Sequence, residues 1–139
     1  AQFGLPEIKL GVFPPAGAAL LPVRVGSGRA AEMVLTGASC TASRAAAAGL
    51  VNKVFPCGDL EAQLNSWLES EFLPRSAPAL RFAAQAARRP LLRALELDLP
   101  ALERVYLDEL MHQPDAVEGV LAFLEKRQPH WLADQPLPA

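Results

Sequence analysis

Apolar positions recur at helical spacing through the second half of the chain. Between residues 60 and 72 they return every three or four positions and predict a helix with one apolar face: Leu60, Leu64, Trp67, Leu68 and Phe72. The same spacing predicts helices over residues 76–89, 91–97, 99–110 and 114–124. In the last of these, four apolar side chains are expected to face inward: Val117, Val120, Leu121 and Leu124.

Glycine and proline punctuate the first half of the chain. Residues 1–15 predict a short extended piece followed by turns. Next come helices over residues 16–25, where Pro22 should bend or end the helix, and over residues 27–35, where Ser27 is the expected N-cap. Thr41 is expected to cap a third helix over residues 42–48.

Residues 50–55 carry β-branched side chains at Val51 and Val54 and predict one short strand. A lone strand is not stable without partners. We therefore expect a mainly α chain that needs strands from elsewhere. We divide it into a core region over residues 1–57, a helical oligomerisation region over residues 58–128 and a loose tail over residues 129–139.

Composition narrows the class of protein further. The 139 residues are 51% hydrophobic and 20% charged, with a net charge of −2, which is typical of a globular domain and too acidic for a nucleic-acid-binding one. No apolar run reaches the ~18 residues of a membrane span, and the start of the chain lacks a signal-peptide pattern. Cys40 and Cys57 have neither metal nor redox spacing, so we expect a reduced, cytoplasmic setting and no metal.

Glu7 is the strongest candidate for chemistry. It lies in a short segment bounded by Gly4, Pro6 and Gly11, a composition that suits a tightly held, non-helical backbone presenting one side chain. From composition alone, a surface glutamate in a loop is the favoured interpretation.

Three blocks of sequence resemble the enoyl-CoA hydratase/isomerase (crotonase) superfamily. They are Gly-Leu-Pro-Glu-Ile-Lys-Leu-Gly-Val-Phe-Pro at residues 4–14, Thr-Gly at residues 36–37 and Gly-Leu-Val-Asn-Lys-Val-Phe-Pro at residues 49–56. The resemblance begins at residue 1, which would fall near mid-chain in that family. It implies the C-terminal half of an α/β spiral (ClpP/crotonase-like) fold, with a helical region that drives assembly into a homotrimer or a dimer of trimers.

The resemblance implies that Glu7 is one of two catalytic glutamates that add water to an α,β-unsaturated acyl-CoA. The second carboxylate and the backbone N–H groups of the oxyanion hole belong upstream in that family, outside these 139 residues. We therefore expect no turnover from this chain alone. No cofactor is implied, because CoA arrives as part of the thioester substrate.

The segment after Glu7 departs from the common family pattern. Residues 15–22 are bulkier and more apolar than the usual glycine-rich stretch. The block that contains Phe13, Pro14 and Pro15 resembles the branch of the family that hydrates a cyclic dienoyl-CoA in anaerobic aromatic degradation. That resemblance implies that these three residues line an acyl pocket.

Near the C-terminus, residues 122–127 resemble the family segment in which an aromatic ring and a lysine contact CoA, often that of a neighbouring subunit. This implies Phe123 for the adenine and Lys126 for a phosphate. The alternative is an amphipathic helix end at which Lys126 and Arg127 complement the helix dipole.

The leading hypothesis is thus part of an acyl-CoA hydratase, a lyase. The rival is a helical oligomerisation module without catalytic activity. Within the enzyme class, isomerase and thioesterase chemistries also remain open, because relatives differ chiefly in side chains that lie upstream.

Overall fold

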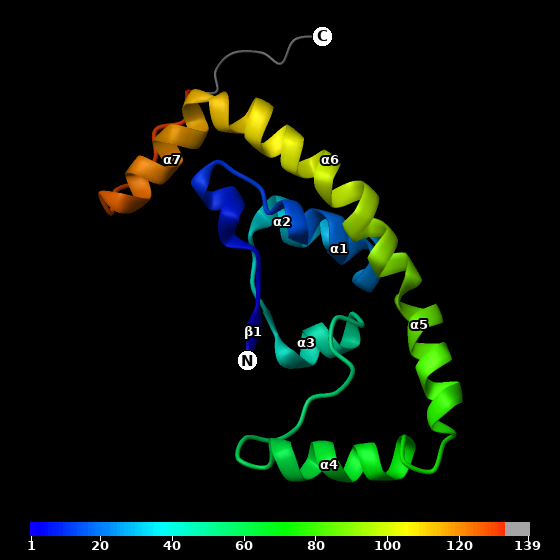
Figure 1. Ribbon diagram of the computed structural model, residues 1–139. Helices are drawn as coiled ribbons and strands as arrows, with labels where there is room; N and C mark the ends of the chain where they lie inside the picture. Colours follow the sequence, from blue (N-terminus) through cyan, green and yellow to red (C-terminus); the bar gives the residue numbers. More distant parts are fainter. Residues whose placement is uncertain (133–139) are drawn as a thin grey trace.

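The computed structural model describes residues 1–132, and most of them are helical (Figure 1). Two short strands, β1 (Gln2–Phe3) and β2 (Cys40–Thr41), pair antiparallel, with Gln2 opposite Thr41 and Phe3 opposite Cys40. This ladder joins the start of the chain to the segment that precedes α3 (Ala42–Ala47). The extended piece expected near residue 1 is therefore present.

The strand predicted at residues 50–55 was wrong. Gly49 turns the backbone at φ +78, and the residues that follow form bends and irregular chain. Strand propensity depends on a neighbouring strand to pair with. Within residues 1–132, β1 and β2 pair only with each other. The Lys53 ammonium instead lies 4.8 Å from the centre of the Trp67 ring.

Helices α1 (Pro15–Val25) and α2 (Ser27–Thr36) lie where the pattern predicted them. Pro22 does not end α1, which continues to Val25, although its missing N–H removes one helical hydrogen bond. The cap prediction at Ser27 was wrong, because Gly26 is the N-cap and Ser27 is the first helical residue. Thr41 does cap α3, since its Oγ1 accepts a hydrogen bond from the Arg44 N–H at 3.4 Å.

A small apolar core holds this part of the chain together. Leu21 of α1 packs with Ala30 and Met33 of α2, and partly buried apolar side chains surround them: Leu5, Val25, Val34 and Leu50. Burial of apolar area at about 25 cal/mol per Å² is the main favourable contribution at such a site. This core holds α1 and α2 beneath the segment that carries Glu7.

The second half of the chain forms helix α4 (Leu60–Glu71) and then a nearly unbroken helical path. Ser76 caps α5 (Ala77–Arg93) by accepting a hydrogen bond from Ala79 N–H at 3.4 Å. Figure 1 shows α5 and α6 as one long curve. Along it lie α6 (Leu99–Arg104), two wider π-type turns, η2 (Ala94–Asp98) and η3 (Val105–Glu109), and a 3₁₀ turn, η4 (Leu110–His112).

The predicted breaks near residues 90 and 98 were wrong. The backbone stays in the right-handed helical region at Arg93, Ala94 and Leu99. Pro100 has no N–H to donate, and the wider turns of η2 directly precede it; insertions of this kind absorb a missing helical bond. Within this helical path, α6 and η2 pack against α1.

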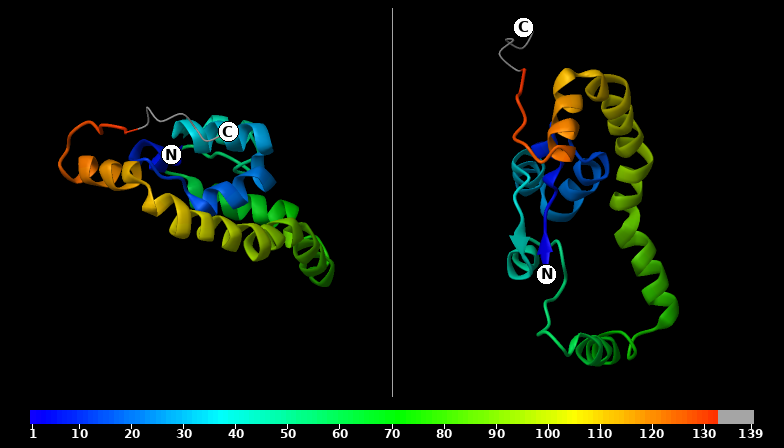
Figure 2. Two further views of the ribbon diagram at one scale, coloured as in Figure 1. Left: turned by 90° about the horizontal axis from the view of Figure 1, so that it is seen from above. Right: turned by 90° about the vertical axis from the view of Figure 1, so that its left-hand side faces the viewer.

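The final helix, α7 (Pro114–Leu124), folds back beside the start of the chain (Figure 2). The inward face predicted for it was wrong. Its buried positions are the small residues Ala116, Gly119 and Ala122, whereas four larger side chains are exposed: Val117, Val120, Leu121 and Leu124. The reason is that α7 approaches its neighbour too closely for large side chains to fit between them.

Helix α4 lies apart from α1–α3 in Figure 1 and in the right-hand view of Figure 2. Its apolar stripe is therefore largely exposed, with Leu60 62% exposed and Leu68 38% exposed. In the described part of the chain, no helix is both long and apolar enough to cross a bilayer.

Candidate functional site

Glu7 lies in a single 3₁₀ turn, η1 (Pro6–Leu10), and not in the non-helical segment that the sequence predicted. Pro6 presets a helical φ at the start of the turn, and Gly11 ends it in the left-handed region at φ +72. The Glu7 carbonyl accepts a hydrogen bond from Val12 N–H at 3.3 Å, and the Ile8 carbonyl accepts one from Gly11 N–H at 3.1 Å. These bonds fix the backbone that carries the Glu7 side chain.

The Glu7 carboxylate has an oxygen without a partner. Its Oε2 is buried, and no donor among the described residues reaches it. Buried polar atoms are nearly always hydrogen-bonded, because an unpaired one costs about 1–3 kcal/mol. An exception of this kind is typical of a group whose partner comes from a substrate, a water or another part of the protein.

Glycines on two helices hold the Glu7 turn. At Gly37, which ends α2 at φ +62, an added Cβ would lie 3.0 Å from Ile8 Cγ2. At Gly119 of α7, it would overlap the Leu10 carbonyl oxygen and lie 2.5 Å from the carbonyl carbon. The turn is therefore clasped between α2, which meets its Ile8 and Lys9 side chains, and α7, which meets its backbone.

The three residues assigned to an acyl pocket follow this turn. Phe13 packs edge-to-face on Tyr106, with ring centres 5.7 Å apart and planes at 76°. Pro14 is buried and serves as the N-cap of α1, where its carbonyl accepts the Ala18 N–H at 2.8 Å. Pro15 is half-buried in the first turn of α1. Phe13 is thus the one of the three that pairs with the long helical path, and the pocket itself stays a prediction.

Phe123 and Lys126 lie at the C-terminal end of α7, and both are exposed, Phe123 by 65%. The helix ends in a Schellman arrangement: Arg127 N–H donates to the Ala122 carbonyl at 3.0 Å, and Lys126 N–H donates to the Phe123 carbonyl at 3.2 Å. Lys126 takes the left-handed position at φ 55, where glycine is usual. The structure thus brings these two residues together at one exposed helix end.

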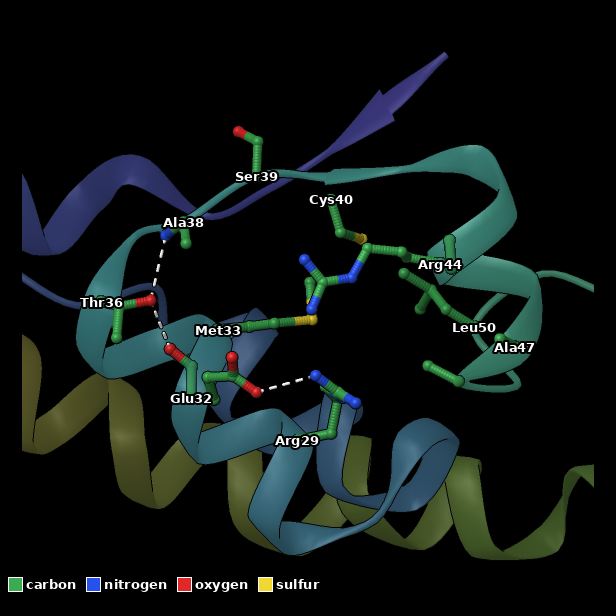
Figure 3. Close-up of a pocket in the computed structure, with 12 residues that line it drawn as sticks. Arg29, Glu32, Met33, Thr36, Ala38, Ser39, Cys40, Arg44, Ala47 and Leu50 are labelled. Atoms are coloured by element: carbon green, nitrogen blue, oxygen red, sulfur yellow. Dashed lines mark hydrogen bonds and ion pairs between the residues drawn. The ribbon is translucent and has the colours of Figure 1, made fainter.

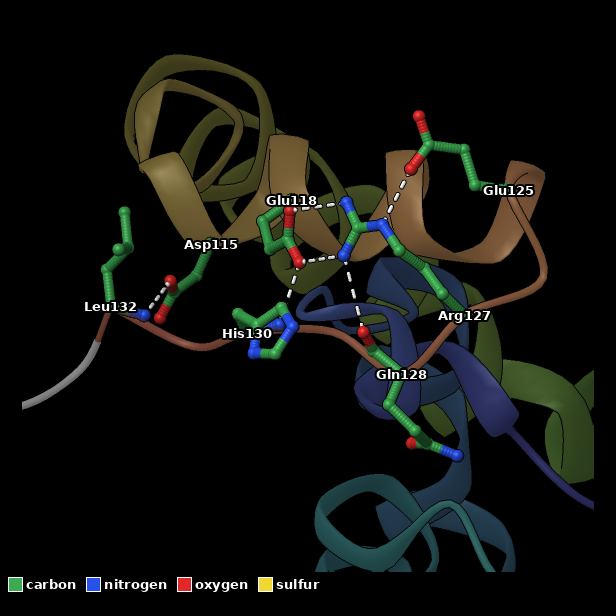
Figure 4. A network of polar contacts seen from close by, with 7 residues as sticks. All are labelled: Asp115, Glu118, Glu125, Arg127, Gln128, His130 and Leu132. Atoms are coloured by element: carbon green, nitrogen blue, oxygen red, sulfur yellow. Dashed lines mark hydrogen bonds and ion pairs between the residues drawn. The ribbon is translucent and has the colours of Figure 1, made fainter.

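Arg127 organises the residues that follow α7 (Figure 4). Its guanidinium donates to both carboxylate oxygens of Glu118, at 2.5 and 2.9 Å, and to Glu125 Oε2 at 2.6 Å. Glu118 Oε1 also accepts the His130 N–H at 2.7 Å, and Asp115 accepts that of Leu132 at 2.7 Å. The backbone N–H groups of His130 and Leu132 therefore bind side chains of α7, and the loose tail over residues 129–139 stays a prediction. The rest of that predicted tail, residues 133–139, lies outside the described residues.

These contacts shift two pKa values. The hydrogen bonds from Arg127 and then from His130 N–H lower the pKa of Glu118 from 4.5 to about 2. The carboxylates of Glu118 and Glu125 raise the pKa of Arg127. Sequence reasoning assigned Arg127 to the helix dipole and missed the pair, because a separation of nine residues across a helix end matches no local rule.

A cavity of about 150 Å³ lies away from Glu7, between α2, α3 and the residues that lead into β2 (Figure 3). Arg29 pairs with Glu32 at 2.9 Å beside it, and Cys40 and Arg44 also line it. None of the residues assigned to catalysis or CoA binding lines it. Within residues 1–132, no three His, Cys, Asp or Glu side chains form a cluster that could hold a metal ion.

Comparisons with known proteins agree on one family. The model of the enoyl-CoA hydratase/isomerase family matches residues 1–134. Cyclohexa-1,5-dienecarbonyl-CoA hydratase of Thauera aromatica is 42% identical over 131 residues, which are 94% of this chain and 50% of that protein. The 2,3-dehydroadipyl-CoA hydratase of Escherichia coli is 45% identical over 130 residues, again 50% of that protein.

Solved structures show the same fold. The crystal structure of carnitinyl-CoA hydratase from Mycobacterium avium superposes with a TM-score of 0.79 at 36% identity, over 96% of this chain and 52% of that one. An enoyl-CoA hydratase from Mycobacterium avium subsp. paratuberculosis superposes with a TM-score of 0.77 at 32% identity. The chain spans about half the length of the curated relatives that it matches.

Proposed function

Because the chain belongs to the enoyl-CoA hydratase/isomerase family, as the blocks within residues 4–56 indicated, we propose that the whole protein is an acyl-CoA hydratase, a hydro-lyase, in which Glu7 transfers a proton. The fold supports this assignment, since it is that of about half of a hydratase of this family. The observation that carries the proposal is the buried, unpartnered Oε2 of Glu7.

The proposed reaction adds water across a double bond conjugated to the thioester. One carboxylate takes a proton from the water while the water oxygen attacks the β-carbon. An acid delivers a proton to the α-carbon. Glu7 is one member of this pair, and the free side of its carboxylate is where water or the second carboxylate belongs. The second carboxylate and the oxyanion donors come from the remainder of the protein. The hydration assay of Glu7→Gln described below tests this role.

We assign the CoA moiety to the end of α7. Phe123 is exposed and presents a flat apolar ring, and Lys126, one turn further on, presents an ammonium. A ring suits adenine and an ammonium suits a phosphate. In a homotrimer or a dimer of trimers, this helix end would meet the acyl-CoA bound by a neighbouring subunit.

For the acyl group we propose a cyclic dienoyl thioester, which would place the enzyme in aromatic degradation. The Thauera aromatica relative supports this choice, and so does the edge-to-face pair of Phe13 and Tyr106, which offers a rigid aromatic wall near the Glu7 turn. The Escherichia coli relative favours a second candidate, 2,3-dehydroadipyl-CoA. Measuring kcat/KM of the whole protein for both thioesters decides between them: the higher value identifies the acyl group, and a higher value for the second overturns the cyclic assignment.

We expect the 139-residue chain to be inactive by itself, because Glu7 lacks its partner groups there. Isothermal titration of this chain with a CoA thioester separates a binding half-site from a module that only oligomerises. If the chain releases heat of binding and the Lys126→Ala variant does not, the chain is a binding half-site. If the chain self-associates and no binding is measured, it is a module that only oligomerises.

A further inference from the structure

We propose that Gly119 is a positioning residue for Glu7: its missing side chain lets α7 lie directly on the backbone of the Glu7 turn and fixes where the carboxylate points. This inference rests on the proposed role of Glu7. It assigns to α7 a function in the chemistry that is separate from CoA binding at the end of that helix.

Each of the two elements in contact carries a glycine there: Gly119 on α7 and Gly11 at the end of the turn. A Cβ at Gly119 would overlap the Leu10 carbonyl oxygen and lie 3.2 Å from Gly11 N. Conversely, a Cβ at Gly11 would lie 2.7 Å from the Asp115 carbonyl oxygen in the first turn of α7. Real Cβ atoms do not approach backbone atoms this closely, so either methyl group would push the helix and the turn apart.

The contact with α7 is made by residues of the same turn that carries Glu7. Leu10 and Gly11 are the last residue and the cap of the five-residue turn that carries Glu7. Gly11 and Val12 donate the N–H groups that bind the carbonyls of Ile8 and Glu7. A displacement of Leu10 and Gly11 therefore moves these donors, and the Glu7 backbone moves with them.

The neighbouring positions on α7 show that the contact is tight. Ala116 and Ala122, one turn to either side of Gly119, are 0% and 1% exposed. On the opposite side of the turn, the α2 cap at Gly37 lies against Ile8 and Lys9. A methyl group added at Gly119 would meet backbone atoms of Leu10, which no side-chain rotation can move aside, so the turn must shift and the direction of Glu7 changes with it.

The test is a double-mutant cycle in the whole protein, using Gly119→Ala and Glu7→Gln. A displacement of about 1 Å at a reacting group can cost about 100-fold, so we expect Gly119→Ala to lower kcat by about 10- to 100-fold with KM changed less than about twofold. If the loss acts through Glu7, adding Gly119→Ala to Glu7→Gln should lower kcat by less than about threefold further. The inference is overturned if the kcat losses of the two single variants multiply in the double variant. It is also overturned if kcat is unchanged in Gly119→Ala.

Gly28→Ala is the matched control. Gly28 also lies in a helix, but no atom of residues 1–132 is within 4 Å of a Cβ added there, so kcat should equal that of the wild type. If Gly119→Ala fails to fold by far-ultraviolet circular dichroism, Ala116→Gly is the second variant, because it removes one buried methyl group a turn away on the same helix and should loosen the packing of α7. It should lower kcat in the wild type but not in Glu7→Gln, and an unchanged kcat again overturns the inference.

The cycle separates this inference from the proposed function. Normal kcat in Glu7→Gln refutes the role of Glu7, and the positioning inference falls with it. A severe loss in Glu7→Gln beside normal kcat in Gly119→Ala refutes the positioning inference alone.

Discussion

Arg127 and Glu118, nine residues apart, form a two-pronged ion pair across the end of α7. The guanidinium Nη1 and Nη2 lie 2.5 and 2.9 Å from the two carboxylate oxygens. Paired N–H···O bonds of this kind fix orientation as well as distance. The same carboxylate accepts the His130 N–H, so a single side chain joins the helix, its end and the chain that follows.

We expect the release of residues 129–132 at low pH. The pKa of Glu118 is lowered from 4.5 to about 2, so the contribution of its ionised form is complete above pH 4.5 and is lost as the pH falls towards 2. Trp131, now 45% exposed, should become more accessible to acrylamide quenching over this range when measured in a Trp67→Phe background. Glu118→Gln should already show the released state at pH 5, and equal quenching in the two proteins at pH 5 would contradict the prediction.

Glu7→Gln should abolish most of the hydration activity of the whole protein. The amide keeps the shape of the side chain and cannot exchange the proton, and loss of one positioned acid or base costs about 100- to 10,000-fold. The measurement is kcat with an unsaturated acyl-CoA, alongside circular dichroism to verify the fold. Glu125→Gln is the matched control, because that carboxylate is exposed and, among the described residues, pairs only with Arg127. Near-normal kcat in Glu7→Gln would refute the assignment.

Lys126→Ala should raise KM for the acyl-CoA more than it lowers kcat. A contact remote from the reacting atoms stabilises ground and transition states equally, which is uniform binding. The effect should shrink as salt rises, because an ammonium–phosphate attraction at the surface is screened over about 10 Å at 0.1 M ionic strength. Lys53→Ala, which changes an exposed lysine on the Trp67 ring, should leave KM unchanged. Unchanged KM in Lys126→Ala at low salt, with the assembly intact, would leave Lys126 as a helix-end charge.

The isolated chain should self-associate at micromolar concentration. Helices α4 and α7 leave apolar side chains exposed that a monomer does not cover, and contiguous patches of this kind favour association. Sedimentation should show a trimer or a larger species, and Leu68→Lys should weaken it because it places a charge in the apolar stripe of α4. Asn65→Lys adds the same charge at an exposed polar position and should have little effect. A monomer with one sharp melting transition would refute the prediction.

The sequence predicted the helices better than it predicted their surroundings. The cap at Thr41 is a local signal and was confirmed, and the helices predicted from residues 16 and 114 begin at Pro15 and Pro114. The strand at residues 50–55 was wrong because a strand requires a partner, which propensity cannot reveal. The inward face of α7 was wrong for the opposite reason: small residues allow the closest approach, so they pack and the larger ones remain exposed.

For the candidate site, sequence located Glu7 through its resemblance to a family, since composition alone did not distinguish it from a surface glutamate. The clasp around its turn could not be predicted, because it joins Gly37, Leu10 and Gly119, which lie far apart in the chain. The Arg127–Glu118 ion pair could not be predicted from the sequence either, because its geometry depends on how the chain turns after α7.

The left-handed backbone at Lys126 sets stability against the proposed phosphate contact at one position. A non-glycine residue there carries strain of about 1–3 kcal/mol, so Lys126→Gly should make the protein harder to melt while it removes the proposed phosphate contact. Lys126→Ala removes the same charge and keeps most of the strain. A screen for thermostability alone would therefore select glycine at residue 126 and discard the proposed phosphate contact. A selection for growth at low substrate concentration would retain lysine despite its backbone.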